Sequence, residues 1–129
     1  MAYQQLPEVP YAYAAVATAG AIVFTAGACP LDSDGSVVGI GDLHMQAQRA
    51  VHNLLTVLNH YGAGPEHLVK TTIYVVGEKD DLRTAWSAVT EQLAPHRPPS
   101  TLLGVSLLGY EGQLIEIDSI AALTTVPSP

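Results

Sequence analysis

Apolar residues follow two patterns along the chain, and each pattern predicts one type of secondary structure. Between residues 42 and 60 they recur every three or four positions, which favours an amphipathic helix with Asp42 as its N-cap. A second stripe of this kind runs from residue 82 to residue 93, with Asp80 or Asp81 as its cap and prolines beyond its end. The pattern therefore predicts two helices.

Short runs of apolar and β-branched residues predict the strands. They lie at residues 13–18, 21–26, 68–76, 101–108 and 114–123. A hairpin turn at Ala19-Gly20 would connect the first two. The order β-β-α-β-α-β-β predicts an α+β two-layer sandwich with both helices on one face of a single sheet. The strands are too apolar for the other face to lie in water, which predicts a homo-oligomer.

Composition changes this picture by showing how little charge the surface carries. The chain has 129 residues, which predicts a single domain 1–129 with loosely ordered tails at 1–9 and 123–129. Charged residues make up 13% of it, against about 25% in ordinary soluble domains. No apolar run has the length of a membrane span or a signal peptide, so we expect no membrane partner and a cytoplasmic location.

The sign of the charge disfavours a nucleic-acid partner. The formal net charge is −7, and the five Lys and Arg are scattered along the sequence. The single cysteine, Cys29, cannot form an intramolecular disulfide, which suits a reducing compartment. No base or cation lies near it in the sequence, so a structural thiol is favoured over a nucleophile.

Metal and cofactor sites find no support in the sequence. His44, His52 and His60 are spaced by eight, and each step turns a helix by about 80°, so the three cannot share one face. The glycine-rich loop at residues 35–41 lacks a lysine and the spacing of a phosphate-binding loop. We therefore expect no metal and no organic cofactor.

Two carboxylates in the last strand are the most informative polar residues. Glu116 and Asp118 alternate with Ile115 and Ile117, so both acids point away from the helices. Acids on a covered face need a polar partner, a water molecule or a ligand. For Glu116 the functional and the structural interpretation are equally supported, whereas for Asp118 the structural one is favoured.

Several segments in a fixed order resemble the YjgF/RidA (Rid) family. They are Pro10-Tyr11, the run from Ile22 to Gly27 with Pro30 soon after, the helix at 46–58, the strand at 69–75 and the final strand at 115–121. The resemblance covers about residues 10–122. It implies a chorismate-mutase-like fold, a homotrimer and ligand clefts between subunits. It also implies hydrolysis of reactive enamines or imines to ammonia and a keto acid, without metal or organic cofactor.

The resemblance further implies site residues, some of which this chain retains. A glutamate that positions the attacking water corresponds to Glu116. The tyrosine near the N-terminus corresponds to Tyr11, and the pocket glycine corresponds to Gly27. The serine before that glycine is replaced by Ala26.

Other implied site residues are replaced. The arginine that clamps the substrate carboxylate corresponds to Ser100, which carries no charge, and the cysteine two residues later corresponds to Leu102. Arg97 is the nearest alternative cation, although two prolines fix its direction. The asparagine of the second helix corresponds to Trp86, which either stacks with Tyr11 on a flat ligand or belongs to the core.

Three functions remain open on this basis. The retained residues favour a Rid-family homotrimer that hydrolyses or deaminates a small enamine or imine. Because Ser100 stands at the arginine position, we do not expect activity on the usual 2-imino acids such as 2-iminobutyrate. The alternative is a non-catalytic trimer that binds or senses a small ligand in the same cleft. An endoribonuclease is the third function, and the acidic charge disfavours it.

Overall fold

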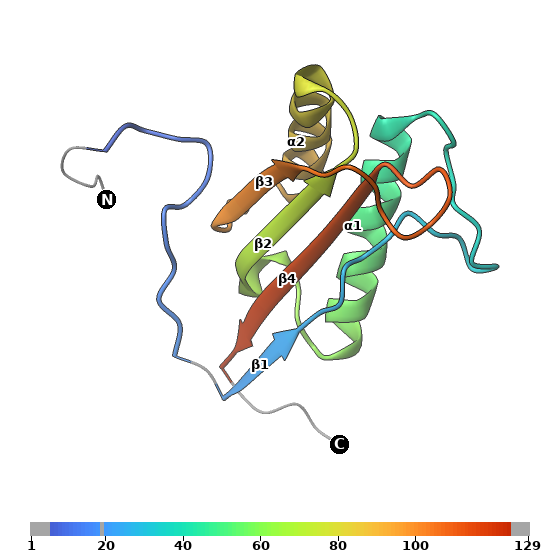
Figure 1. Ribbon diagram of the computed structural model, residues 1–129. Coiled ribbons are helices and arrows are strands. Elements are labelled where there is room, and N and C mark those ends of the chain that lie inside the picture. Colours follow the sequence, from blue (N-terminus) through green and yellow to red (C-terminus); the bar gives the residue numbers. More distant parts are fainter. Residues whose placement is uncertain (1–5, 19, 125–129) are drawn as a thin grey trace.

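The predicted helices and sheet are present in the computed structural model, which describes residues 6–18 and 20–124 (Figure 1). The elements follow one another as β1 (Ala21–Phe24), α1 (Leu43–His60), a short 3₁₀ helix (Pro65–His67), β2 (Leu68–Val75), α2 (Lys79–Leu93), β3 (Ser100–Gly104) and β4 (Ile115–Leu123). Asp42 caps α1 as expected, because its carboxylate accepts a hydrogen bond of 3.0 Å from the Met45 N–H.

The sheet has the strand order β1-β4-β2-β3. Strand β4 is antiparallel to both β1 and β2, and β3 is parallel to β2. It follows that β1, β2 and β3 run in one direction, so their carboxyl ends lie at the end of the sheet where β4 begins. The loop after β1 and the residues that lead into β4 both lie at this end.

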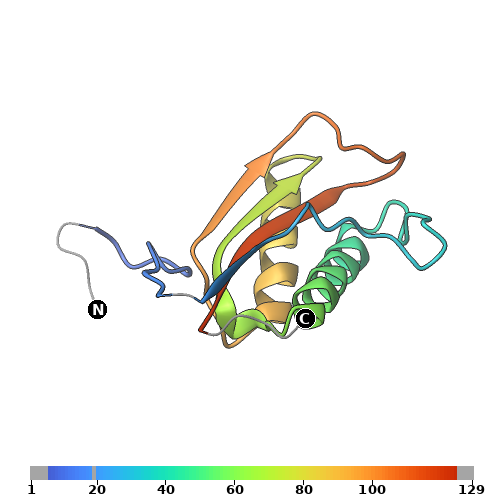
Figure 2. The same ribbon diagram turned by 90° about the horizontal axis from the view of Figure 1, so that it is seen from below.

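Both helices pack on the same face of the sheet, so the α+β two-layer prediction is confirmed (Figure 2). Side chains alternate along β4, and Ile115 and Ile117 are fully buried toward the helices while Glu116 and Asp118 point to the other face. That other face carries exposed apolar side chains on β1, where Ile22 is 53% and Phe24 72% exposed.

The predicted first strand at residues 13–18 is wrong, since the structure has no strand there. The turn residue Ala19 lies outside the described residues. Half of the segment is alanine, which forms strands poorly, and residues 14–18 are exposed. The residue just before the segment instead contacts the connection between α2 and β3, where the Ala12 N–H donates to the Arg97 carbonyl at 3.3 Å. Strand β1 consequently borders the sheet as an edge strand.

Several element boundaries also differ from the prediction. Helix α2 is capped by Glu78, and Asp81 lies inside its first turn, where it accepts a hydrogen bond of 2.7 Å from the Glu78 N–H. Strand β3 ends at Gly104, so residues 105–108 belong to a loop. Leu123 is the last residue of β4 and is buried, so it is not part of a loosely ordered tail, while residues 1–5 and 125–129 of the predicted tails lie outside the described residues.

No helix within the described ranges has both the length and the apolar character needed to cross a membrane.

Candidate functional site

Glu116 lies directly over the backbone of Gly27. The segment after β1 pairs with β4 through Ala28, whose N–H donates to the Ile117 carbonyl at 2.6 Å and whose carbonyl accepts from the Ile117 N–H at 3.1 Å. This pairing places Cys29 opposite Glu116, the second residue of β4, and Gly27 diagonally across from it. A Cβ atom at position 27 would overlap the Glu116 carboxylate, so only glycine leaves room for this side chain.

Two neutral donors hold the carboxylate of Glu116. The Gln113 amide donates to Oε1 at 3.3 Å, and the Cys29 thiol donates to the same oxygen at 3.4 Å. No Lys, Arg or His nitrogen of residues 6–18 or 20–124 lies within ion-pair distance of it. The carboxylate is thus oriented without being neutralised by a cation, which is the state in which it can accept a proton from water.

Gln113 is itself fixed in place. Its side chain is buried, and its amide nitrogen also donates to the Ile115 carbonyl at 3.0 Å. Its amide oxygen accepts a hydrogen bond of 3.1 Å from the Tyr110 N–H. The loop before β4 therefore supplies, through this glutamine, one of the two donors that orient the Glu116 side chain.

The Cys29 thiol is half-buried and acts here as a hydrogen-bond donor. Burial raises the pKa of this thiol, and the hydrogen bond to Glu116 and the negative charge of that carboxylate raise it further. The thiol therefore stays protonated at neutral pH, as a donor to Glu116 requires, and this state does not favour a nucleophile.

Replacing Glu116 by Gln is expected to lower the pKa of Cys29, because the negative charge and the charged acceptor disappear while burial remains. The rate of alkylation by iodoacetamide, followed against pH, measures this shift without interference, since the chain has one cysteine. The midpoint should move to lower pH in Glu116→Gln and stay in place in Asp118→Asn. An unchanged midpoint in Glu116→Gln would contradict the contact.

Asp118 has a structural partner, in agreement with the interpretation favoured above. The Tyr74 hydroxyl donates to its carboxylate at 2.9 Å. This hydrogen bond is the main reason why the pKa of Tyr74 is raised, and burial and the charges of Asp118 and Glu116 add to it. Tyr74 is paired with Glu116 across β2 and β4, so one tyrosine lies next to both acids.

A second group of predicted site residues lies at the β3 edge of the sheet. They line a groove of about 860 Å³ between α2 and β3, and they are Tyr11, Trp86, Ser100 and Leu102. The rings of Tyr11 and Trp86 pack edge to face, with centroids 5.9 Å apart. Trp86 is half-buried and also touches the core, so both of its predicted roles have contacts that support them.

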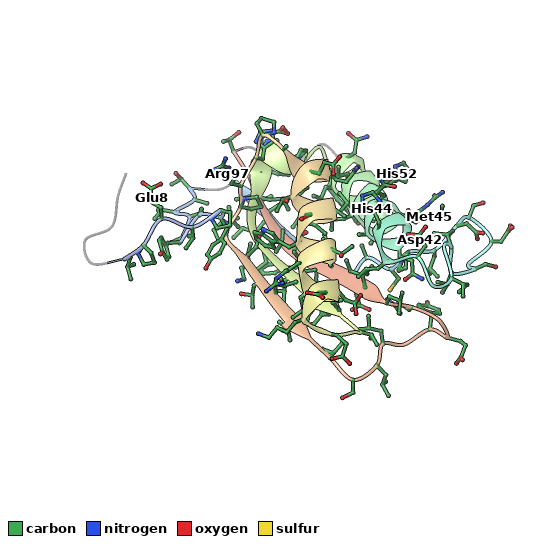
Figure 3. The ribbon with its side chains drawn as sticks, turned by 90° about the horizontal axis from the view of Figure 1, so that it is seen from above. Glu8, Asp42, His44, Met45, His52 and Arg97 are labelled. Carbon is green, nitrogen blue, oxygen red and sulfur yellow. The ribbon has the colours of Figure 1, made fainter. Side chains whose placement is uncertain are left out.

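Ser100 does not offer a free hydroxyl to this groove. It shares a hydrogen bond of 2.6 Å with the Thr71 hydroxyl and donates to the Pro98 carbonyl at 3.0 Å. Arg97 lines an adjoining cavity of about 410 Å³ together with Ser100 and Trp86. Figure 3 places Arg97 on the side from which the segment at residues 6–18 extends.

The structure does not bring the two groups together within one chain. Glu116 and Gly27 belong to β4 and the segment after β1, whereas Ser100 and Leu102 belong to β3. Strand β2 lies between β4 and β3 in the sheet. The six predicted site residues therefore form two separate half-sites, which we call the Glu116 half-site and the Trp86 half-site.

Sequence reasoning missed the buried and half-buried amides that shape the Glu116 half-site. Besides Gln113, they are on α1: Asn53 donates to the carbonyls of Cys29 and Leu31 at 2.8 and 2.9 Å. The fully buried Gln46 donates to the Gly112 carbonyl at 2.9 Å. A signal for Gln46 was present, because it lies within the apolar stripe of its helix, where an amide needs a partner.

The histidines of α1 lie apart from both half-sites. His44, His52 and His60 are exposed, and Figure 3 shows the first two along the helix. Over the described part of the chain, no group of three His, Cys, Asp or Glu residues is arranged to hold a metal ion.

Comparison with known proteins identifies the family. The sequence profile of the family described as Endoribonuclease L-PSP matches residues 3–123. The chain is 32% identical to a RutC family protein of Synechocystis, over 94% of this chain and 93% of that one. A solved Rid-family protein of Yersinia pestis, YyfB, superposes with a TM-score of 0.84 at 27% identity, covering 95% of this chain and 96% of that one. The chain belongs to the YjgF/RidA (Rid) family.

Another relative of this Rid protein is Protein DfrA of Myxococcus xanthus, with 34% identity over 87% of this chain and 84% of that one. The match to the solved structure confirms the predicted chorismate-mutase-like fold. The structure shows what Ser100 does at the position of the implied arginine. The serine hydroxyl is bonded to Thr71 and Pro98 and does not stand in for a cation.

Proposed function

We propose that this Rid protein is a cofactor-independent hydrolase of a small enamine or imine other than the usual 2-imino acids. The observation that carries the proposal is the Glu116 carboxylate, held over Gly27 by Gln113 and Cys29 with no cation from the described part of the chain against it. A carboxylate oriented in this way has the properties of a general base for water.

The proposed reaction is the addition of water to a C=N bond. Glu116 accepts one proton from water as the oxygen bonds to the imine carbon, and it passes that proton to the nitrogen, which gives the carbinolamine. Glu116 then takes the proton of the carbinolamine hydroxyl and delivers it to the nitrogen, so that the C–N bond breaks as the C=O bond forms, ammonia leaves and the carboxylate is regenerated. An enamine enters the same sequence after it has tautomerised to the imine. The Gly27 backbone lies against the carboxylate, and its N–H is proposed to donate to the polar end of the substrate.

Oligomer formation would complete the site. The two half-sites lie on different parts of one chain, and the face of the sheet opposite the helices carries exposed apolar residues such as Phe24. In the proposed homotrimer the Glu116 half-site of one subunit faces the Trp86 half-site of the next, which forms a cleft between subunits. Light scattering after gel filtration should give three times the chain mass of 13.6 kDa.

The decisive experiment measures ammonia release from freshly generated imines. We expect little acceleration over buffer with 2-iminobutyrate or 2-aminoacrylate, because no arginine stands at position 100. Imines whose acid group is remote from the C=N bond, or absent, should be hydrolysed faster than in buffer. Failure with every imine and enamine in such a panel would overturn the proposal.

Replacing Gly27 by Ala should lower turnover by about 10²-fold, because the new methyl group displaces the Glu116 carboxylate by about 1 Å or more. Gly109→Ala is a matched control, since a Cβ there meets nothing within 4 Å and its backbone is not in the left-handed region. Steady-state kinetics of both variants, with circular dichroism to verify folding, test this. Equal activity in the two variants would contradict the role of the close contact.

A non-catalytic trimer that binds or senses a small ligand is the second candidate. The observation in its favour is that the Trp86 half-site is aromatic and that its serine hydroxyl is already bonded. The two candidates differ in whether Glu116 is needed for turnover. An endoribonuclease stays disfavoured by the net charge of −7. RNA cleavage that survives repurification and is lost in Glu116→Gln would reverse that judgement.

A further inference from the structure

The groove at the Trp86 half-site combines an aromatic floor with positive charge. Lys79 and Arg83 line it beside Trp86, and these three residues of α2 follow one another at intervals of four and three. That spacing places them on one face of the helix. Among the described residues, none of those that line the groove is an Asp or Glu. In a chain of net charge −7, this is a local reversal of sign.

The apolar part of the groove suits a flat ring. Tyr11 and Trp86 meet edge to face, and Leu82 and Leu102 add aliphatic surface on either side. Aromatic side chains bind rings by edge-to-face or offset contacts. The volume of about 860 Å³ leaves space for a ring beyond these side chains.

The positive charges lie at defined distances from this ring position. Arg83 precedes Trp86 by three residues, which is about 5 Å along the helix axis, and Lys79 precedes it by seven, which is about 10 Å. A ligand whose ring rests on Trp86 and whose acid group is one to three bonds away from the ring can therefore reach Arg83. A longer acid can reach Lys79.

The ion pair of Arg83 does not prevent this contact. Arg83 Nη1 lies 3.1 Å from Asp80 Oδ1, and the two side chains are 80% and 90% exposed. Exposed pairs contribute little free energy, so a ligand carboxylate can displace Asp80. A guanidinium group binds a carboxylate through two parallel hydrogen bonds, which gives the ligand a fixed direction.

We propose that the Trp86 groove binds an aromatic acid, with the ring against Trp86 and Tyr11 and the acid group at Arg83 and Lys79. The binding of such an acid stands on the groove alone. That the bound acid is the substrate rests on the proposed hydrolase function. The acid group of such a ligand is remote from the reacting bond. Arg83 and Lys79 on α2 would bind it, in place of the arginine that this chain lacks at position 100 on β3.

The test uses the fluorescence of Trp86, which is the only tryptophan of the chain. The full-length protein is titrated with phenylacetate and with phenylacetamide, which share a ring and differ in charge. We expect both to change the emission, with the acid binding about tenfold more tightly than the amide at low salt. The preference should shrink at high salt because the cations are exposed.

Three variants make the test specific. Lys79→Gln combined with Arg83→Gln should remove the preference for the acid, whereas Arg49→Gln on α1 should retain it. Asp80→Asn should strengthen acid binding, because it releases Arg83. The proposal is overturned if neither compound binds, if the amide binds as tightly as the acid, or if the preference survives the double variant. Because the probes do not react, absence of turnover would sink the hydrolase and leave this result intact.

Discussion

Glu116→Gln is expected to lower the turnover number by about 10²–10⁴-fold, the range that one general base contributes. The substitution keeps the size of the side chain and an oxygen that can accept from Gln113 and Cys29, but it removes the group that takes the proton. Binding of phenylacetate at Trp86 should be retained, because the contacts proposed for it are made by residues of the groove, which Glu116 does not line. Kinetics and the fluorescence titration measure the two effects separately.

Asp118→Asn is the matched control for this prediction. Asp118 lies two residues further along the same face of β4, and its carboxylate is bonded to Tyr74. We expect it to retain most of the activity, since an amide oxygen can still accept from the tyrosine. If Glu116→Gln keeps full turnover, the general-base role is wrong. If neither the wild-type protein nor any variant turns over while ligands still bind, the non-catalytic trimer is the better description.

Gln46→Leu is expected to destabilise the fold by about 3 kcal/mol, the largest effect on stability that we predict for a single polar residue here. Gln46 is fully buried and satisfies three backbone groups: the carbonyls of Gly39 and Gly112 and the N–H of Leu114. Leucine fills a similar volume but leaves these groups without partners. Urea denaturation followed by circular dichroism measures the free energy of unfolding.

Gln48→Leu provides the comparison for Gln46→Leu. Gln48 is two residues along the same helix and is exposed, so its replacement should change the free energy of unfolding by less than about 0.5 kcal/mol. Equal changes in the free energy of unfolding in the two variants would show that the buried hydrogen bonds of Gln46 do not stabilise the fold. The Gln46 variant should also lose activity below its melting temperature, since Gln46 ties α1 to the loop that carries Gln113.

The sequence predicted the parts of the fold in which local pattern and tertiary packing agree. The stripe of α1, its cap at Asp42 and the alternation of β4 all follow from a buried face of regular period. The strand expected at residues 13–18 did not form, because a short alanine-rich run has little tendency to pair and its neighbours Tyr11 and Ala12 contact the β3 side.

The site was predictable in its residue types and not in its arrangement. The alternation of β4 put Glu116 on the correct face, and the family resemblance indicated Gly27 and Tyr11. The helical spacing of Lys79, Arg83 and Trp86 is present in the sequence, but the groove that they line together with β3 is not, because it depends on how α2 packs on the sheet. The interaction of Gln113 and Cys29 with one carboxylate likewise joins residues 84 positions apart.

The separation of the half-sites has a genetic consequence. In the proposed trimer each cleft takes Glu116 from one subunit and Trp86 from another. Two inactive genes, one without Glu116 and one without the cations of the groove, would then complement each other when expressed together. Mixed trimers would contain some clefts built from two intact halves and others built from two damaged halves. Activity recovered when two inactive alleles are expressed together would therefore show, in living cells, that each cleft is shared between two subunits.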